Sequence, residues 1–274
     1  MNSVVNLEDL TNKTIAIARE AGAYIRQERH NFSMQSVEAK GLHDFVSYVD
    51  KTAEKMIVEA LANLVPGAGF IAEENTAAKR AERYNWVIDP LDGTTNFIHG
   101  VPIFSVSIAL MEHQEVVAGV VYEINLDECF YAWRGSAAYC DGKIIRVSDA
   151  RKVADSLLVT GFPYTDYGKL QPYLRMFEYF LRNSHGVRRL GSAAADLAWM
   201  ACGRFEAFYE YGLNAWDVAA GALIVQQAGG KITDFDSGNN YIFGAELLAS
   251  NGKIHDELMQ IVGKYFPAGE QDEK

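Results

Sequence analysis

Cysteine and proline are scarce in this sequence of 274 residues, which has three of the former and six of the latter. The cysteines, Cys129, Cys140 and Cys202, are odd in number and widely spaced, with no CxxC pair, so they do not predict a disulfide framework. No proline-rich or serine-rich linker divides the chain. We therefore expect reduced thiols and two closely packed subdomains instead of independent modules.

Long apolar runs and basic clusters are missing as well. No apolar run reaches the length of about 18 residues that indicates a membrane helix, and the first residues lack the basic and apolar regions of a targeting signal. Lysine and arginine number 25 against 36 aspartates and glutamates, for a formal charge of −11. Because nucleic acids are held mainly by clustered cations, we expect that the protein does not bind them. Since a membrane helix and a targeting signal are missing, we also expect a cytoplasmic protein that does not bind membranes. The excess of carboxylates suits metal ions better.

The apolar residues, 49% of the chain, are spaced in patterns that predict both helices and strands. Helical spacing follows a possible cap at Asn6, and it begins again after Ser47 and ends near Pro66. Short runs of Val, Ile, Phe and Tyr from Ile103 to Trp133 predict a meander of antiparallel strands. Further along the two patterns alternate, with helices at about 170–183, 192–203 and 215–228 and a strand at about 205–210.

These patterns predict a mixed α/β fold in which layers of helices and sheets alternate. We expect an N-terminal α+β subdomain over residues 1–150, with metal-binding motifs, and a C-terminal α/β subdomain over residues 151–274 that completes the active site. The two subdomains should form one compact unit.

The strongest local signal is the segment 86–97, which reads WVIDPLDGTTNF. An apolar strand ends here with Asp89 and Asp92 at a turn forced by proline and glycine, so both carboxylates can point into one pocket and share hard cations. The amides of Gly93, Thr94 and Thr95 could converge on an anion such as phosphate if Thr95 opens a helix or turn. Taken alone, an Asp-Gly pair is more commonly a solvated turn, and the interpretation depends on its neighbours.

Acidic residues at three other places support a metal site. Glu73 and Glu74 follow an apolar triplet and would point in opposite directions at a strand end, so one could join the metals while the other stays solvated. Asp50 and Asp217 each stand in the first turn of a predicted helix, where an aspartate is usually a cap. The small residues that follow Asp217 favour a closely packed helix that positions this carboxylate.

Together these segments resemble the inositol monophosphatase family, from about residue 6 to about residue 265. Residues 86–97 resemble the first signature of that family almost position by position. The segment from Trp216 to Gly230, which begins WDVAAG, resembles the second. The resemblance implies a sandwich like those of inositol monophosphatase and fructose-1,6-bisphosphatase.

The resemblance also implies a site for two to three Mg²⁺ ions. One ion would be held by Glu73, Asp89 and the backbone carbonyl of Leu91, a second by Asp89, Asp92 and Asp217, and a weaker third by Glu73 and water. Thr94 and Asp50 would orient and deprotonate the attacking water, which makes Asp50, Glu73 and Thr94 the catalytic candidates. These roles agree with the preference of Mg²⁺ for oxygen ligands.

The implied substrate contacts lie in both halves of the chain. They are Glu73, Leu91, Asp92, Gly93, Thr94, Gly191, Ser192, Ala193, Glu210 and Asp217. Ser192 is equally well explained as the cap of a helix, and both roles can hold together. Glu210 is the position expected to govern specificity.

We therefore expect a Mg²⁺-dependent phosphoric monoester hydrolase that acts on a small polyol or sugar phosphate, with inositol 1-phosphate as the first choice. A homodimer and inhibition by lithium are further implications of the resemblance. Alternatives on the same fold are the hydrolysis of fructose 1,6-bisphosphate, histidinol phosphate or 3′-phosphoadenosine 5′-phosphate. Arg188 and Arg189 could clamp a second phosphate or lie on the surface, and Tyr164, Tyr167 or Tyr211 could stack on an adenine.

A non-enzymatic alternative is a metal-stabilised interaction protein of a transcription complex. The complete set of five acids argues against it, because a protein that had lost catalysis would have no reason to keep Asp50, Glu73, Asp89, Asp92 and Asp217.

Overall fold

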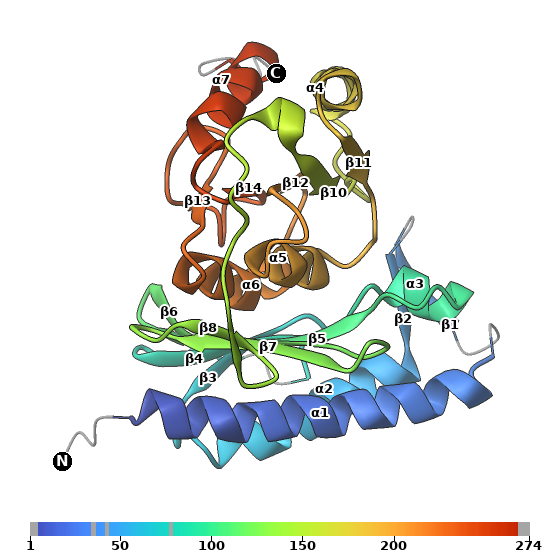
Figure 1. Cartoon of the computed structure of the whole chain (residues 1–274). Coiled ribbons are helices and arrows are strands. Elements are labelled where there is room, and N and C mark those ends of the chain that lie inside the picture. Colours follow the sequence, from blue (N-terminus) through green and yellow to red (C-terminus); the bar gives the residue numbers. More distant parts are fainter. Residues whose placement is uncertain (1–4, 34–36, 42–43, 77–78, 268–274) are drawn as a thin grey trace.

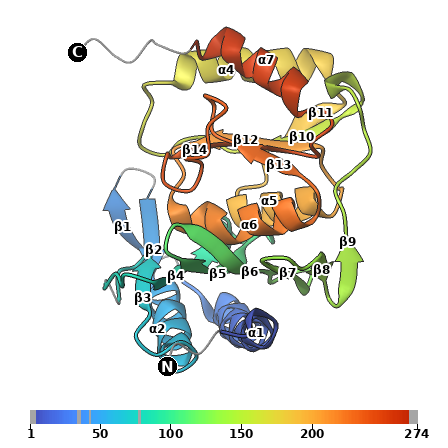
Figure 2. The same ribbon diagram turned by 90° about the vertical axis from the view of Figure 1, so that its left-hand side faces the viewer.

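The computed structural model describes residues 5–33, 37–41, 44–76 and 79–267, and only the backbone for 37–41 and 44–46. Within these residues, layers of helices and sheets alternate, as Figures 1 and 2 show. The outer layers are helical: α1 (Leu7–Asn31) and α2 (Tyr48–Ala62) at one end, and α4 (Leu170–Asn183) and α7 (His255–Tyr265) at the other. Two more helices, α5 (Ala193–Ala201) and α6 (Ala215–Gln227), lie between the two main sheets.

The larger sheet has seven strands among the described residues. Their order is β3 (Gly69–Ala72), β4 (Tyr84–Asp92), β5 (Ser105–Glu112), β6 (Glu115–Glu123), β7 (Glu128–Trp133), β8 (Ala138–Cys140) and β9 (Lys143–Ile145). Strand β3 runs parallel to β4, and every later pair is antiparallel. The meander predicted from Ile103 to Trp133 is therefore confirmed.

The smaller sheet mixes parallel and antiparallel pairs. Its order is β11 (Gly186–Arg188), β10 (Leu157–Thr160), β12 (Ala207–Tyr211), β14 (Glu246–Ser250) and β13 (Lys231–Thr233). Strand β10 is parallel to both β11 and β12, whereas β14 is antiparallel to its two neighbours. A hairpin of β1 (Val37–Gly41) and β2 (Asp44–Ser47) precedes α2, and the short helix α3 (Thr94–His99) follows β4.

Close packing holds α6 against both of its neighbours. A Cβ atom on Gly119 of β6 would lie 2.8 Å from the carbonyl oxygen of Ala220, and one on Gly221 would lie 2.6 Å from Cβ of Leu197 on α5. Such distances allow only glycine, so the small residues of α6 are what let this helix approach the larger sheet. The closely packed helix predicted after Asp217 is confirmed.

The layered α/β fold predicted from the sequence is also confirmed, and helix bounds agree to within a few residues. The helix predicted at 192–203 is Ala193–Ala201, and Asn6 caps α1 by accepting from the Asp9 amide at 3.1 Å. Strands from Gly69 to Ile145 belong to the larger sheet and those from Leu157 to Ser250 to the smaller. The division at residue 150 into subdomains stays a prediction. Among the described helices, none has the length and apolarity to cross a membrane.

Candidate active site

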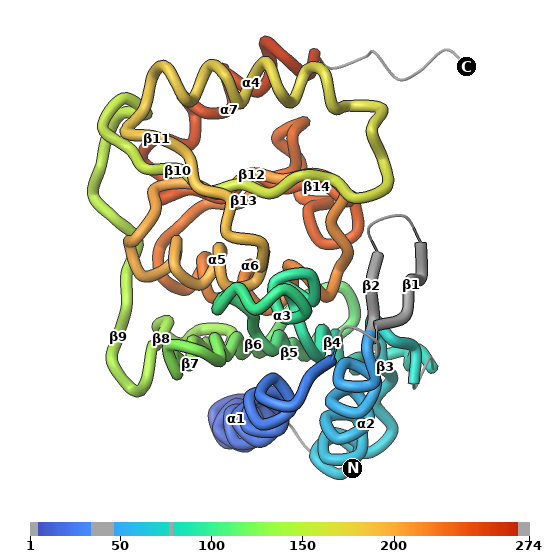
Figure 3. Tube along the Cα trace, turned by 90° about the vertical axis from the view of Figure 1, so that its right-hand side faces the viewer, coloured from blue at the N-terminus to red at the C-terminus, as the bar shows by residue number. Residues whose placement is uncertain are grey.

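A cavity of about 400 Å³ opens where β4 ends. The starts of α3, α5 and α6 contribute to its wall, and Figure 3 shows α3 at a level between the larger sheet and these two helices. The residues that line it include Glu73, Asp89, Leu91, Asp92, Gly93, Thr94, Gly191, Ser192, Ala193, Glu210 and Asp217. All the predicted metal and substrate positions therefore meet in one cavity, although the two signature segments are far apart in the chain.

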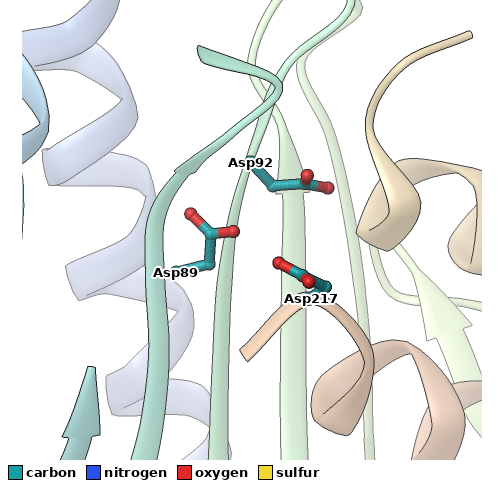
Figure 4. A group of neighbouring side chains, drawn as sticks. All are labelled: Asp89, Asp92 and Asp217. Carbon is teal, nitrogen blue, oxygen red and sulfur yellow. The ribbon is translucent and has the colours of Figure 1, made fainter. Parts of the chain in front are cut away.

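Three aspartates form the centre of this site (Figure 4). Each of Asp89, Asp92 and Asp217 offers a carboxylate oxygen, and these oxygens all lie within 4.8 Å of one another. Asp89 and Asp92 come from the end of β4, and Asp217 comes from the first turn of α6. Backbone amides close in the sequence hold two of them: the Leu91 amide donates to Asp89 at 2.9 Å, and the Asn214 amide donates to Asp217 at 2.6 Å.

The three carboxyl groups are buried close together, so their negative charges repel one another. Burial raises the pKa of Asp89 well above its ordinary range, and the charges of Glu73 and Asp92 raise it further. Burial also raises the pKa of Asp92 to about 6 and that of Asp217 to about 7. Buried carboxylates that repel one another are stabilised by a bound cation, and a donor set made only of oxygens suits Mg²⁺. The residues present therefore fit the predicted metal.

Thr94 links the cavity to Asp50. The Thr94 hydroxyl lies 2.9 Å from Asp50 Oδ1 and 3.0 Å from the Leu91 carbonyl oxygen. Asp50 is fully buried and also accepts from the amide and the hydroxyl of Ser47, in the capping box of α2. Asp50 thus reaches the cavity through Thr94, and it is a helix cap at the same time. Burial raises the pKa of Asp50, while its hydrogen bonds to Ser47 and Thr94 lower it.

The start of α5 is joined to Asp92. The Ser192 hydroxyl donates to Asp92 at 2.6 Å and the Ala194 amide at 2.7 Å, while Ser192 also caps α5. Gly93 has φ of 95°, and a Cβ there would lie 3.1 Å from the Gly191 carbonyl oxygen. Only glycine combines this backbone conformation with so close an approach. The two predicted roles of Ser192, cap and site residue, are compatible in this geometry.

Glu210, on β12, also lines the cavity, and this residue is 8% exposed. A Cβ on Gly161 would be 2.1 Å from both of its carboxylate oxygens, so the glycine leaves room for this side chain. Arg189 lines the cavity and donates to the Tyr164 hydroxyl at 2.8 Å. Arg188 lies outside the lining residues and donates to the Val187 carbonyl.

The adenine interpretation finds little support in the placement of the tyrosines. Tyr164 lines the cavity, whereas Tyr167 and Tyr211 do not. Tyr211 is buried with its ring edge against Tyr173, 5.0 Å between centroids. Its ring is therefore part of the core beneath α4.

Sequence reasoning missed three residues of the site. Asn96 donates to the carbonyls of Ile103 and Leu190 at 2.8 and 2.7 Å, which ties α3 to the loop before α5. Asp196 lines the cavity, and Glu54 of α2 accepts from amides beside Glu73. Asp196 could have been found, because it stands four residues after Ser192 and so on the same helix face.

These features define a class of protein, a layered α/β sandwich with an oxygen-rich cavity built for hard cations. The chain belongs to the inositol monophosphatase family, whose model matches residues 6–265. Members of this family in general depend on Mg²⁺ and act on phosphate monoesters.

Individual relatives carry two different names. The chain is 38% identical to the inositol-1-monophosphatase of Mesorhizobium japonicum, over 94% of this chain and 98% of the relative. It is 39% identical to the Nus factor SuhB of Pseudomonas aeruginosa, over 95% and 98%. The crystal structure of the extragenic suppressor protein suhB from Bartonella henselae superposes with a TM-score of 0.87 at 38% identity, over 93% of this chain and 99% of that one.

Proposed function

We propose that this protein is a Mg²⁺-dependent phosphatase that hydrolyses inositol 1-phosphate, or a closely similar polyol phosphate, to the alcohol and phosphate. The observation that carries the proposal is the meeting of Asp89, Asp92 and Asp217 within 4.8 Å, next to the Thr94–Asp50 pair. A metal-binding carboxylate cluster beside a group that can take a proton is what hydrolysis of a phosphate ester needs.

The proposed metal ligands are the ones expected from the sequence. Glu73, Asp89 and the Leu91 carbonyl would hold one ion, Asp89, Asp92 and Asp217 a second, and Glu73 with water a third. When bound, Mg²⁺ supplies positive charge that stabilises the phosphate in the transition state and makes water a stronger acid.

The chain's own groups bind the substrate and move a proton. Gly93 and Thr94 line the cavity at the start of α3, and their amides would donate to the phosphate oxygens. Thr94 donates to Asp50, so the remaining lone pairs of its oxygen are free to accept from the attacking water. Asp50 would take that proton through Thr94, and its raised pKa suits this role.

Phosphate release from a panel of esters tests the proposal. The panel contains inositol 1-phosphate, glycerol 2-phosphate, fructose 1,6-bisphosphate, histidinol phosphate and 3′-phosphoadenosine 5′-phosphate, each with Mg²⁺ and with EDTA. We expect Mg²⁺-dependent release, fastest from inositol 1-phosphate. Fastest release from another member would select that alternative, and release in EDTA would contradict the metal requirement.

Replacement of Asp92 by asparagine makes the first mutational prediction. Asp92→Asn removes a charge from the metal cluster but keeps the shape of the side chain and an acceptor for Ser192 and the Ala194 amide. Because metal-ion stabilisation is worth several kcal/mol, kcat should fall at least about 100-fold. Isothermal calorimetry should show weaker Mg²⁺ binding. A fully active variant would contradict the role of Asp92 as a metal ligand.

The relatives named Nus factor SuhB support a second candidate, an interaction protein of a transcription complex. A variant inactive as a phosphatase separates the two functions. In a strain whose growth requires this gene, growth supported by Asp92→Asn would favour the interaction. If growth requires the activity, the phosphatase is the function.

Three further expectations belong to the same proposal: a homodimer, location in the cytoplasm, and inhibition by lithium. Sedimentation velocity tests the first and cell fractionation the second. Undiminished phosphatase activity in millimolar lithium would contradict the third.

A further inference from the structure

A buried carboxyl group without a hydrogen-bond partner lies in the wall of the cavity. Asp196 is 1% exposed, and its Oδ1 atom has no partner among the described residues. Removing a carboxyl oxygen from water without a new hydrogen bond costs free energy, so nearly all such groups in proteins are paired. An unpaired one in a cavity wall indicates a ligand that supplies the missing donor.

A second acceptor shares this part of the cavity. Asp196 lies close enough to Glu210, Asp92 and Arg189 for their charges to act on its carboxyl group. Glu210 is also buried, and no described residue donates a hydrogen bond to its carboxyl group. Asp92 differs, because Ser192 and the Ala194 amide already donate to it. Asp196 and Glu210 are therefore two side-chain acceptors of the cavity, away from the aspartate cluster, that no described residue fills.

We propose that Asp196 is a specificity-determining residue which, with Glu210, accepts hydrogen bonds from the hydroxyl groups of the substrate's alcohol part. The inference rests on the proposed phosphatase function, which places the phosphate at the aspartate cluster and leaves the alcohol to face these two side chains.

Charge argues against an alcohol part that carries a second phosphate. A second phosphate would face two carboxyl groups, with Arg189 as the one cation that lines the cavity in the described part of the chain. Burial raises the pKa of Asp196 and of Glu210 well above their ordinary values, so further negative charge beside them is unfavourable, whereas a hydroxyl donor adds none.

Comparison of two substrates tests the proposal. Inositol 1-phosphate carries hydroxyl donors on its alcohol, whereas phenyl phosphate carries none. Asp196→Ala should lower kcat/KM for inositol 1-phosphate by about 10- to 100-fold, the range for a lost hydrogen bond to a carboxyl group, and change that for phenyl phosphate much less. Asp196→Asn keeps one acceptor oxygen and should lose less. If Asp196 had a purely structural role, both variants would lower kcat/KM for the two substrates alike, and that result would overturn the proposal.

The matched control is Asp166→Ala, which removes the same carboxymethyl side chain down to Cβ from an exposed position in the segment 161–169 outside the cavity lining. This variant should leave kcat/KM unchanged for both substrates. If the wild-type protein hydrolyses neither ester, the proposed function fails, and calorimetry of inositol 1-phosphate with Mg²⁺ then makes the comparison without turnover. Weaker binding by Asp196→Ala than by the control would support the role of Asp196; equal binding, or none by the wild type, would overturn it.

Discussion

Thr94 is the residue through which a buried acid reaches the cavity. Its hydroxyl is 2.9 Å from Asp50, and its backbone amide opens α3. Thr94→Val has nearly the same shape but no hydroxyl, so it should lower kcat by about 100-fold or more, the range for general base catalysis. Thr94→Ser keeps the hydroxyl and should retain most of the activity. Kinetics at saturating Mg²⁺ check this, and equal activity of the two variants would contradict the proton path.

At the same scale, the residues of the segment 86–97 could be predicted from the sequence, whereas the roles of Arg189 and Asp196 could not. Asp89, Asp92 and Gly93 were found because one short segment carries strand, turn and acids together. Arg189 could not be separated from Arg188, because which of two adjacent side chains faces the cavity depends on how the chain leaves β11. The unpaired oxygen of Asp196 depends on what surrounds it in three dimensions, so no sequence pattern reveals it.

At the scale of the element, α2 supports two sides of the site from one face. Asp50 and Glu54 are one turn apart; the first contacts Thr94, and the second is fully buried and accepts from the amides of Glu74 and Thr76, each at 2.7 Å. The carboxylate of Glu54 thereby fixes the segment that carries Glu73, a proposed metal ligand. The helix was predicted from its spacing, but contacts across 20 residues of sequence could not be.

Loss of Glu54 should loosen that segment. Glu54→Ala leaves two amides without their acceptor, so the unfolding free energy should fall by about 2 to 4 kcal/mol, and the Mg²⁺ concentration for half-maximal activity should rise several-fold. Urea unfolding and Mg²⁺ titration measure the two effects. Glu59→Ala, on the exposed side of the same helix, is the control. A Mg²⁺ dependence equal to that of the control would show that Glu54 does not position Glu73.

At the scale of the whole molecule, the free energy of unfolding should depend on pH through two kinds of group, whose pKa values are shifted in opposite directions. The site aspartates have raised pKa values, so without metal they favour the folded state more as the pH falls below about 7. His255 acts the other way. It is fully buried between the hydroxyls of Thr233 and Ser250, at 3.1 and 2.9 Å, and burial, with Lys231 nearby, lowers its pKa to about 4.

The contribution of His255 can be isolated by difference. Between pH 6.5 and about 4 the unfolded chain binds a proton that the folded one excludes, so the stabilisation by neutral His255 is complete above that window and is lost as the pH falls through it. The wild type should therefore lose roughly 2 kcal/mol relative to His255→Gln, solvent screening being allowed for. Urea unfolding of both proteins in EDTA at several pH values measures it, and the site aspartates cancel because both proteins contain them. A difference that does not change with pH would mean that His255 titrates in the folded protein as it does in the unfolded chain.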